Sequence, residues 1–143
     1  MRLQLALALA SALALSSCGG PVTQATCDDA AKAGNWAATF KLDEGPADCP
    51  APTQLNGTFA LPGACDPGCS CAEASISYVQ PTGAQQAGSC QLKLSQQCPD
   101  ASSLDCRDVY LDSAAHAAGE CYYNGTGKAG SFQCLYSVSW EKQ

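Results

Sequence analysis

This sequence of 143 residues has few positive charges, a single histidine and no long uninterrupted apolar run. Each shortage argues against a class of protein. Seven Lys and Arg against thirteen Asp and Glu give a formal net charge of −6, so the chain lacks the basic surface that nucleic acid requires. The length supports one domain and leaves no room for a multidomain enzyme. No segment shows a sustained helical period, which disfavours a parallel α/β sheet.

The most apolar segment lies at the start of the chain, and it is too short to cross a membrane. Arg2 is followed by a run rich in Leu and Ala from Leu3 to Leu15. A helix of this length rises about 20 Å, whereas the hydrocarbon core of a bilayer is about 30 Å thick. We therefore predict a cleavable signal peptide over residues 1–17.

The residues that follow this run are Leu15-Ser16-Ser17-Cys18, and they resemble the lipobox of bacterial lipoproteins. The resemblance implies that the Cys18 thiol carries a diacylglyceryl group, that cleavage occurs before Cys18, and that the new amine is acylated, for example by palmitate. Residues 18–26 would then be a lipidated tether. Because Gly19 rather than Asp follows, the family's sorting rule implies the outer membrane, on either its periplasmic or its outer face. The alternative is an ordinary secretory signal with Cys18 in a disulfide.

Cysteine parity favours the lipid anchor over that alternative. Without Cys18 the chain keeps an even number of cysteines, which suits complete pairing in an oxidising compartment. Leu, Ile, Val and Phe are scarce after residue 17, so disulfides would have to supply stability that a thin core cannot. We expect a single disulfide-linked β domain over residues 27–143, with these cysteines paired: Cys27, Cys49, Cys65, Cys69, Cys71, Cys90, Cys98, Cys106, Cys121 and Cys134.

Local spacing suggests one disulfide in particular. Cys121 and Cys134 are symmetric about Gly127-Lys128 in a glycine-rich segment that we interpret as a turn, so we favour their pairing. Cys71–Cys98 is a weaker possibility of the same kind, and Cys98–Cys106 is a competing local closure. The Asn-Gly pairs at residues 56–57 and 124–125 match glycosylation sequons, but in a bacterial lipoprotein we interpret them as turns.

Apolar residues alternate with polar ones in several short segments, which predicts strands. The clearest are 36–42, with Trp36 and Phe40 on one face, and 131–140, with Tyr136 and Trp140 on one face. Further strands are expected near 56–61, 75–80, 90–94, 107–112 and 120–124. We therefore predict an all-β domain, a small antiparallel sandwich or barrel of about seven strands. One short surface helix is expected over residues 28–34.

Few residues have the pattern of a catalytic or metal site. The cluster Cys65-Asp66-Pro67-Gly68-Cys69-Ser70-Cys71 lacks the spacing of a redox pair or a zinc site, which favours structural disulfides. His116 would have to serve any Ser-His-Asp triad, with Asp108 or Asp112 to orient it, but its Ala- and Gly-rich surroundings indicate an exposed loop. Carboxylates crowd two stretches of the chain and suggest a solvated acidic face. They are Asp43, Glu44 and Asp48 in the first stretch and Asp100, Asp105, Asp108 and Asp112 in the second.

Gly34-Asn35-Trp36, a G-x-W sequence at the start of a predicted strand, resembles the opening motif of lipocalins and related calycins. The resemblance implies a Trp packed across a barrel base and an interior apolar ligand, although ten cysteines and a short chain depart from that family. Tyr122, Tyr123, Tyr136 and Trp140 suggest either a carbohydrate-stacking surface or ordinary strand packing.

Together these features predict a lipid-anchored protein of the bacterial cell envelope, in which a non-enzymatic domain binds or scaffolds a partner. We expect attachment to the membrane through lipid on Cys18, no binding of nucleic acid, and no cofactor or metal. The partner could be a protein, a glycan or a small ligand. Two alternatives stay open at this point, a calycin-like carrier of a small apolar ligand and a hydrolase that uses His116.

Overall fold

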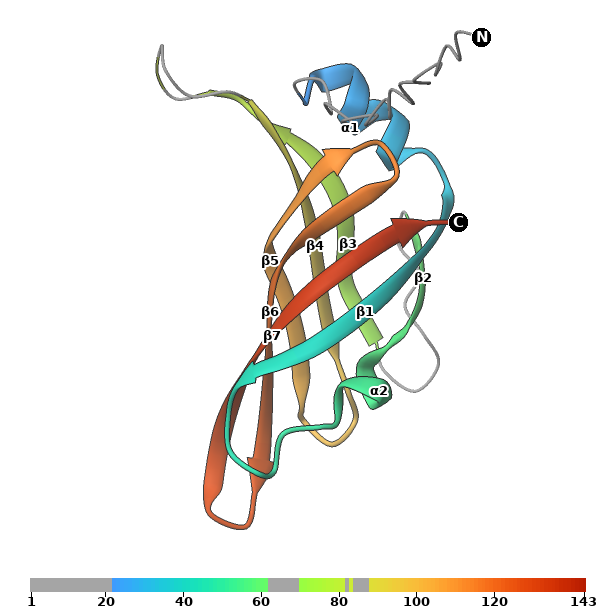
Figure 1. The fold of residues 1–143 in the computed structure, drawn as a ribbon. Coiled ribbons are helices and arrows are strands. Elements are labelled where there is room, and N and C mark those ends of the chain that lie inside the picture. Colours follow the sequence, from blue (N-terminus) through green and yellow to red (C-terminus); the bar gives the residue numbers. More distant parts are fainter. Residues whose placement is uncertain (1–21, 62–69, 82, 84–87) are drawn as a thin grey trace, which may run out of the picture.

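The computed structural model describes residues 22–61, 70–81, 83 and 88–143, which form one curled antiparallel sheet of seven strands (Figure 1). The strands lie in the spatial order β2-β1-β7-β6-β5-β4-β3. Their bounds are β1 Gly34–Glu44, β2 Gly57–Leu61, β3 Ser70–Val79, β4 Ser89–Gln97, β5 Ser103–Ser113, β6 His116–Gly127 and β7 Gly130–Lys142. The all-β fold with about seven strands is confirmed, and its form is a single sheet curled into a half-barrel.

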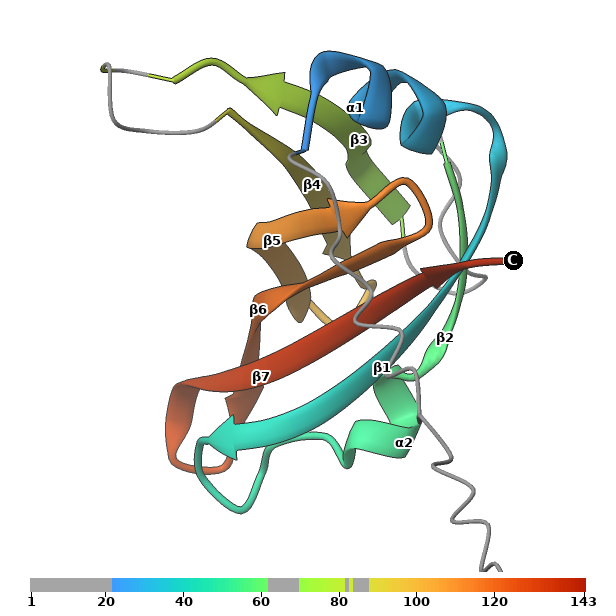
Figure 2. The same cartoon turned by 45° about the horizontal axis from the view of Figure 1, so that its top comes forward.

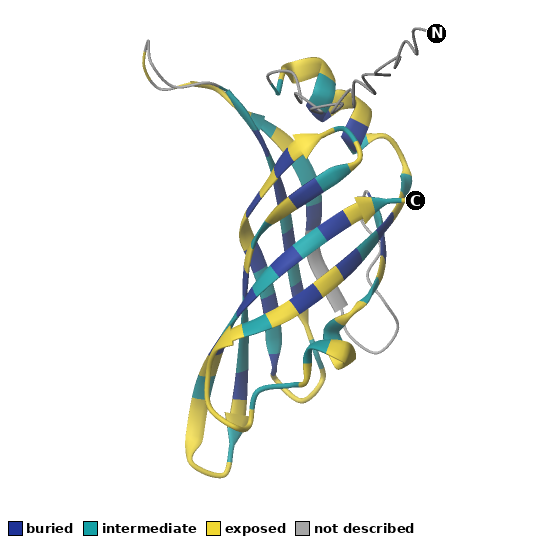
Figure 3. Ribbon diagram, in the orientation of Figure 1, coloured by how far each residue is buried: buried dark blue, intermediate teal, exposed yellow. Residues whose placement is uncertain are grey.

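Period-two alternation places the apolar side chains inside the curl. Trp36, Ala38 and Phe40 of β1 are buried, as are Tyr136 and the other inward residues of β7, and Figure 3 shows the alternation along both strands. Because β1 pairs with β7, segments from the two ends of the domain share one part of the core. The predicted inward faces of these two strands are confirmed.

Two short helices accompany the sheet, α1 (Gln24–Ala31) and α2 (Pro52–Leu55). The predicted helix over 28–34 is displaced, because Thr23 caps α1 and exchanges hydrogen bonds with Thr26 in a capping box. The helix therefore begins inside the segment predicted as a tether. It also buries Cys27 and Ala30, so the expectation that it lies only on the surface is wrong.

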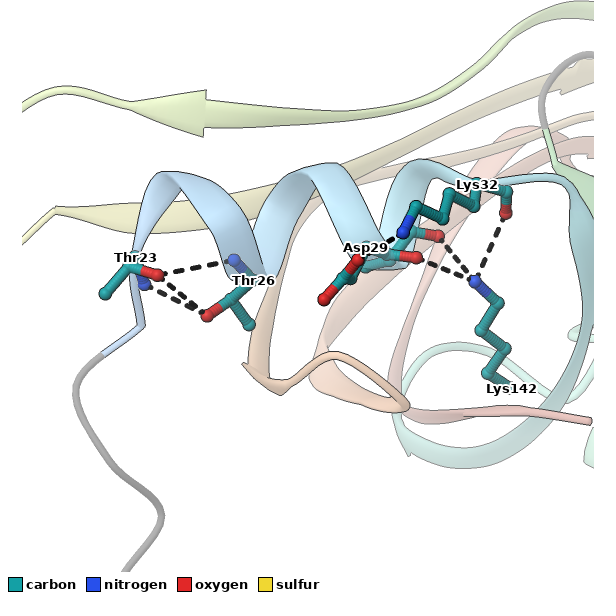
Figure 4. A network of polar contacts seen from close by, with 6 residues as sticks. Thr23, Thr26, Asp29, Lys32 and Lys142 are labelled. Carbon is teal, nitrogen blue, oxygen red and sulfur yellow. Dashed lines mark hydrogen bonds and ion pairs between the residues drawn. The ribbon is translucent and has the colours of Figure 1, made fainter.

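Helix α1 lies across one end of the half-barrel (Figure 2). Both a disulfide and a lysine link it to the sheet. Cys27 is bonded to Cys90 of β4. Lys142, at the end of β7, directs its Nζ at the last carbonyls of α1, 2.9 Å from the oxygen of Asp29 and 3.2 Å from that of Lys32 (Figure 4). A cation at a helix C-terminus satisfies carbonyls that lack partners and complements the helix dipole.

Two further disulfides correct the pairing predicted from spacing. Cys49 is bonded to Cys134, and Cys106 is bonded to Cys121, so neither Cys121–Cys134 nor Cys98–Cys106 forms. Cys98 is disulfide-bonded as well. Cys65 and Cys69 lie outside the described residues, and only the backbone of Cys71 is described.

The predicted pairing of Cys121 with Cys134 was wrong because the turn between β6 and β7 was placed incorrectly. Strand β6 continues through Asn124-Gly125 to Gly127, so the turn is centred on Lys128-Ala129 rather than on Gly127-Lys128. A shift of one residue in the centre moves every cross-strand partner by two, and Cys134 consequently lies opposite Tyr123. On the other side of β6, Asp105 lies opposite Tyr122, which places Cys106 beside Cys121.

Candidate functional site

The only histidine of the chain lies in a chain of hydrogen bonds on the outer face of the sheet. His116 Nδ1 is 2.7 Å from Oδ2 of Asp112, and His116 Nε2 is 3.0 Å from Oγ of Ser139. One ring nitrogen donates and the other accepts in the neutral ring. The three side chains therefore lie in the order Asp-His-Ser that general-base activation of a serine requires.

Strand register explains how three distant residues meet. His116 is the first residue of β6, directly after the tight turn from β5, and Asp112 is near the end of β5. Ala118 of β6 lies opposite Ser139 of β7, so the imidazole of His116 reaches diagonally across the strands to the Ser139 hydroxyl. The prediction of an exposed loop around His116 is wrong, and of the two candidate acids the structure brings Asp112 to the ring.

The surroundings of this Asp112–His116–Ser139 cluster limit its chemistry. The His116 side chain is 33% exposed and that of Asp112 is 66% exposed, so both are in contact with water. Ser139 lies opposite Thr39 on one side and Ala118 on the other. In a central strand the backbone N–H takes part in the sheet ladder, so that of Ser139 is not free to stabilise an oxyanion.

Two of the other carboxylates, Asp43 and Asp105, each have their own partners. Asp43 accepts a hydrogen bond from Ser137 and is 3.2 Å from Lys41, and these contacts hold the pKa of the carboxyl below its usual range. Asp105 pairs with Arg107 at 2.7 Å. Within the described residues, no three His, Cys, Asp or Glu side chains gather closely enough to hold a metal ion.

The two tryptophans lie in the core rather than on a binding surface. Trp36 and Trp140 are fully buried, and the rings of Trp140 and Phe59 are 4.9 Å apart. Tyr136 is also buried, which excludes it and Trp140 from a surface that stacks carbohydrate. The indole nitrogens of Trp36 and Trp140 are buried and have no hydrogen-bond partner. Such groups are uncommon in folded proteins because an unpaired buried donor is costly.

A groove that was not predicted from the sequence lies where the β6–β7 hairpin meets the β4–β5 turn. Its volume is about 420 Å³, and its polar side chains are Asn124, Thr126, Ser131 and Gln133. Ala101, in the β4–β5 turn, forms part of its wall. Each residue is unremarkable in the sequence, and only the pairing of β6 with β7 places the four polar side chains together.

Comparisons with known proteins do not assign a function to this chain. No family model, no curated protein and no solved structure matches the chain. In the described part of the chain, neither helix has the length and apolar character needed to cross a membrane.

Proposed function

We propose that the protein is a lipid-anchored binding module of the bacterial cell envelope, attached through Cys18. The observation that carries this proposal is the lipobox-like sequence ending at Cys18, followed by an even number of cysteines. The disulfides Cys27–Cys90, Cys49–Cys134 and Cys106–Cys121 support an oxidising compartment outside the cytoplasm.

The position of α1 fits attachment at its end of the domain. Only four residues separate Cys18 from Thr23, which caps the helix. An extended chain spans at most about 3.6 Å per residue, so the tether holds α1 within about 18 Å of the lipidated residue. Two or more acyl chains give stable anchoring without a transmembrane helix.

Lipid labelling in a bacterial host tests the anchor. Wild-type protein should incorporate an alkyne-tagged palmitate and sediment with membranes. Cys18→Ala should lose both properties, while Ser16→Ala, which keeps a small residue in the lipobox, should retain them. Unchanged labelling and sedimentation of Cys18→Ala would refute the anchor. Gly19→Asp should move the protein from the outer to the inner membrane fraction, as the family's sorting rule implies.

A second candidate function, a serine hydrolase, is favoured by the Asp112–His116–Ser139 cluster. In that reaction Ser139 Oγ would bond to an ester carbonyl carbon and pass its proton to His116 Nε2. The proton would then go to the departing alkoxide, and water would hydrolyse the acyl-enzyme. A fluorophosphonate probe should label Ser139, and Ser139→Ala should abolish labelling. Ser137→Ala is the matched control on the same strand and face. Absence of labelling in the wild type would exclude this candidate.

A third candidate, a carrier for a small apolar ligand, is favoured by the buried indole N–H groups of Trp36 and Trp140. A ligand with a carbonyl oxygen would supply the acceptor that these donors lack. Titration with an apolar fluorescent ketone should then quench tryptophan emission saturably. Emission that stays unchanged would exclude the carrier.

A further inference from the structure

The groove at the β6–β7 hairpin combines amides and hydroxyls without any charged side chain. Asn124 lies opposite Gln133, and Thr126 lies opposite Ser131, so four polar side chains lie together on one face of the hairpin. None of the residues that line the groove carries a charge, although the chain as a whole has a net charge of −6. A lining of this kind has no group to neutralise an ion, and beside its polar side chains it includes the aromatic residue Phe132.

The amides of the groove are held in fixed orientations. Asn124 Oδ1 accepts a hydrogen bond of 2.9 Å from Gln133 Nε2, and Asn124 Nδ2 donates to Ser103 Oγ at 3.4 Å. These contacts leave the Gln133 carbonyl oxygen and one hydrogen of each amide for a ligand, since an amide has two donors and one acceptor oxygen. Side chains held before binding lose less entropy when the ligand arrives.

The hydroxyls of the groove add groups that both donate and accept. Thr126 and Ser131 are exposed, and neither hydroxyl has a hydrogen-bond partner among the described residues. Asp100, which precedes Ala101 of the groove wall, is occupied, because its Oδ1 accepts hydrogen bonds from the backbone N–H and the hydroxyl of Ser102. The groove therefore offers neutral donors and acceptors side by side.

The wall of the groove includes an uncommon backbone conformation. Ala101 has a φ of +64°, and it is the one non-glycine residue with a positive φ in the described part of the chain. Such a conformation costs of order 1 kcal/mol or more and is enriched at binding sites. Ala101 lines the groove from the β4–β5 turn, next to residues of the hairpin.

We propose that this groove binds a neutral saccharide. The hydroxyls of a sugar both donate and accept hydrogen bonds, which matches a lining of amides and hydroxyls, and the volume of about 420 Å³ lies in the range of small-molecule sites. The β6–β7 hairpin and the β4–β5 turn, which line the groove, lie at the opposite end of the half-barrel from α1 (Figure 1), so a protein anchored through Cys18 would present the groove away from the membrane. Binding itself does not depend on the lipid.

Nuclear magnetic resonance of the mature lipidated protein in phosphocholine micelles tests this site. The probes are two neutral oligosaccharides, maltotetraose and chitotetraose, with a heparin tetrasaccharide and a tetra-alanine peptide as comparators. We expect at least one neutral probe to cause saturable shifts confined to backbone amides around the groove. No saturable shift with either neutral probe, or stronger binding of a comparator, would overturn the proposal.

Matched variants locate the binding. Thr126→Ala and Gln133→Ala should each weaken binding about 3- to 10-fold, the effect of losing one hydrogen bond. Both side chains are exposed, so the variants should keep the melting temperature of the wild type. Thr39→Ala, an exposed threonine on β1, should bind as the wild type does, and an equal loss in that variant would contradict the site. Cys18→Ala should lose membrane attachment yet keep saccharide binding, which separates this proposal from the anchor.

Discussion

The disulfide between Cys49 and Cys134 should contribute more stability than the one between Cys106 and Cys121. The first closes a sequence separation of 85 residues and the second a separation of 15. Loop-closure entropy in the unfolded chain gives about 4.6 kcal/mol for the long loop and about 3.1 kcal/mol for the short one. In the unfolded chain the remaining disulfides shorten the path between Cys49 and Cys134. They therefore reduce the entropic contribution of this disulfide to about 4 kcal/mol. We therefore expect a difference of about 1 kcal/mol between the two double Cys→Ala variants.

Urea unfolding of both variants, followed by tryptophan fluorescence, measures this difference, because Trp36 and Trp140 are buried in the folded domain. Which of the two variants is less stable distinguishes two physical causes, loop-closure entropy in the unfolded chain and packing in the folded one. Cys106 and Cys121 are both fully buried, whereas Cys49 is only partly buried, so lost packing would harm the short-loop variant more. A larger loss of stability in the Cys106→Ala/Cys121→Ala variant would therefore refute the unfolded-state argument.

Three further predictions concern the loops that bracket the sheet. Gly45→Ala should destabilise the domain by about 2 kcal/mol in urea unfolding, because Gly45 has a φ of +154° and a Cβ there would overlap Cys49 Sγ. Tyr136→Phe should cost about 1 kcal/mol in the same assay, because the buried Tyr136 hydroxyl donates to the Pro50 carbonyl at 2.6 Å; unchanged stability would contradict that contact. Hydrogen bonds from Ser102 lower the pKa of Asp100. The contribution of this carboxylate to folding stability is therefore present above the unfolded-state pKa of about 3.9 and is lost as pH falls through the folded pKa. In Ser102→Ala, carboxyl titration by nuclear magnetic resonance should show the Asp100 pKa closer to its ordinary value, and an unshifted pKa would refute the assignment.

The strands were predictable because burial imposes a period of two on the sequence. Trp36, Phe40, Tyr136 and Trp140 alternate with polar residues, and each is buried as expected. The half-barrel was not predictable in the same way. Alternation identifies the inward face of each strand, but the choice between two stacked sheets and one curled sheet depends on the order of the strands. The pairing of β7 with β1, which joins the two ends of the domain, leaves no local signal.

Contacts between distant residues account for what the sequence missed at the candidate sites. His116 has Ala and Gly as neighbours in the sequence, yet its partner Ser139 is 23 residues away and lies two strand positions from Glu141, the residue directly opposite His116. The groove depends in the same way on the exact register of β6 and β7. Sequence spacing located the hairpin but misplaced its centre by one residue, and that shift suffices to change both the disulfides and the side chains that meet.

The links between α1 and the sheet bear on how an anchored domain would be held at a membrane. With Cys18 lipidated as proposed, any pull on the tether enters the domain at Thr23 and the start of α1. A short helix alone would unravel under such a load, because isolated helices of this length are marginal in water. Here Cys27–Cys90 connects the first turns of α1 covalently to β4, and Lys142 connects its last carbonyls to β7. Under the proposed anchoring, the load would therefore pass through α1 to two different strands of the sheet.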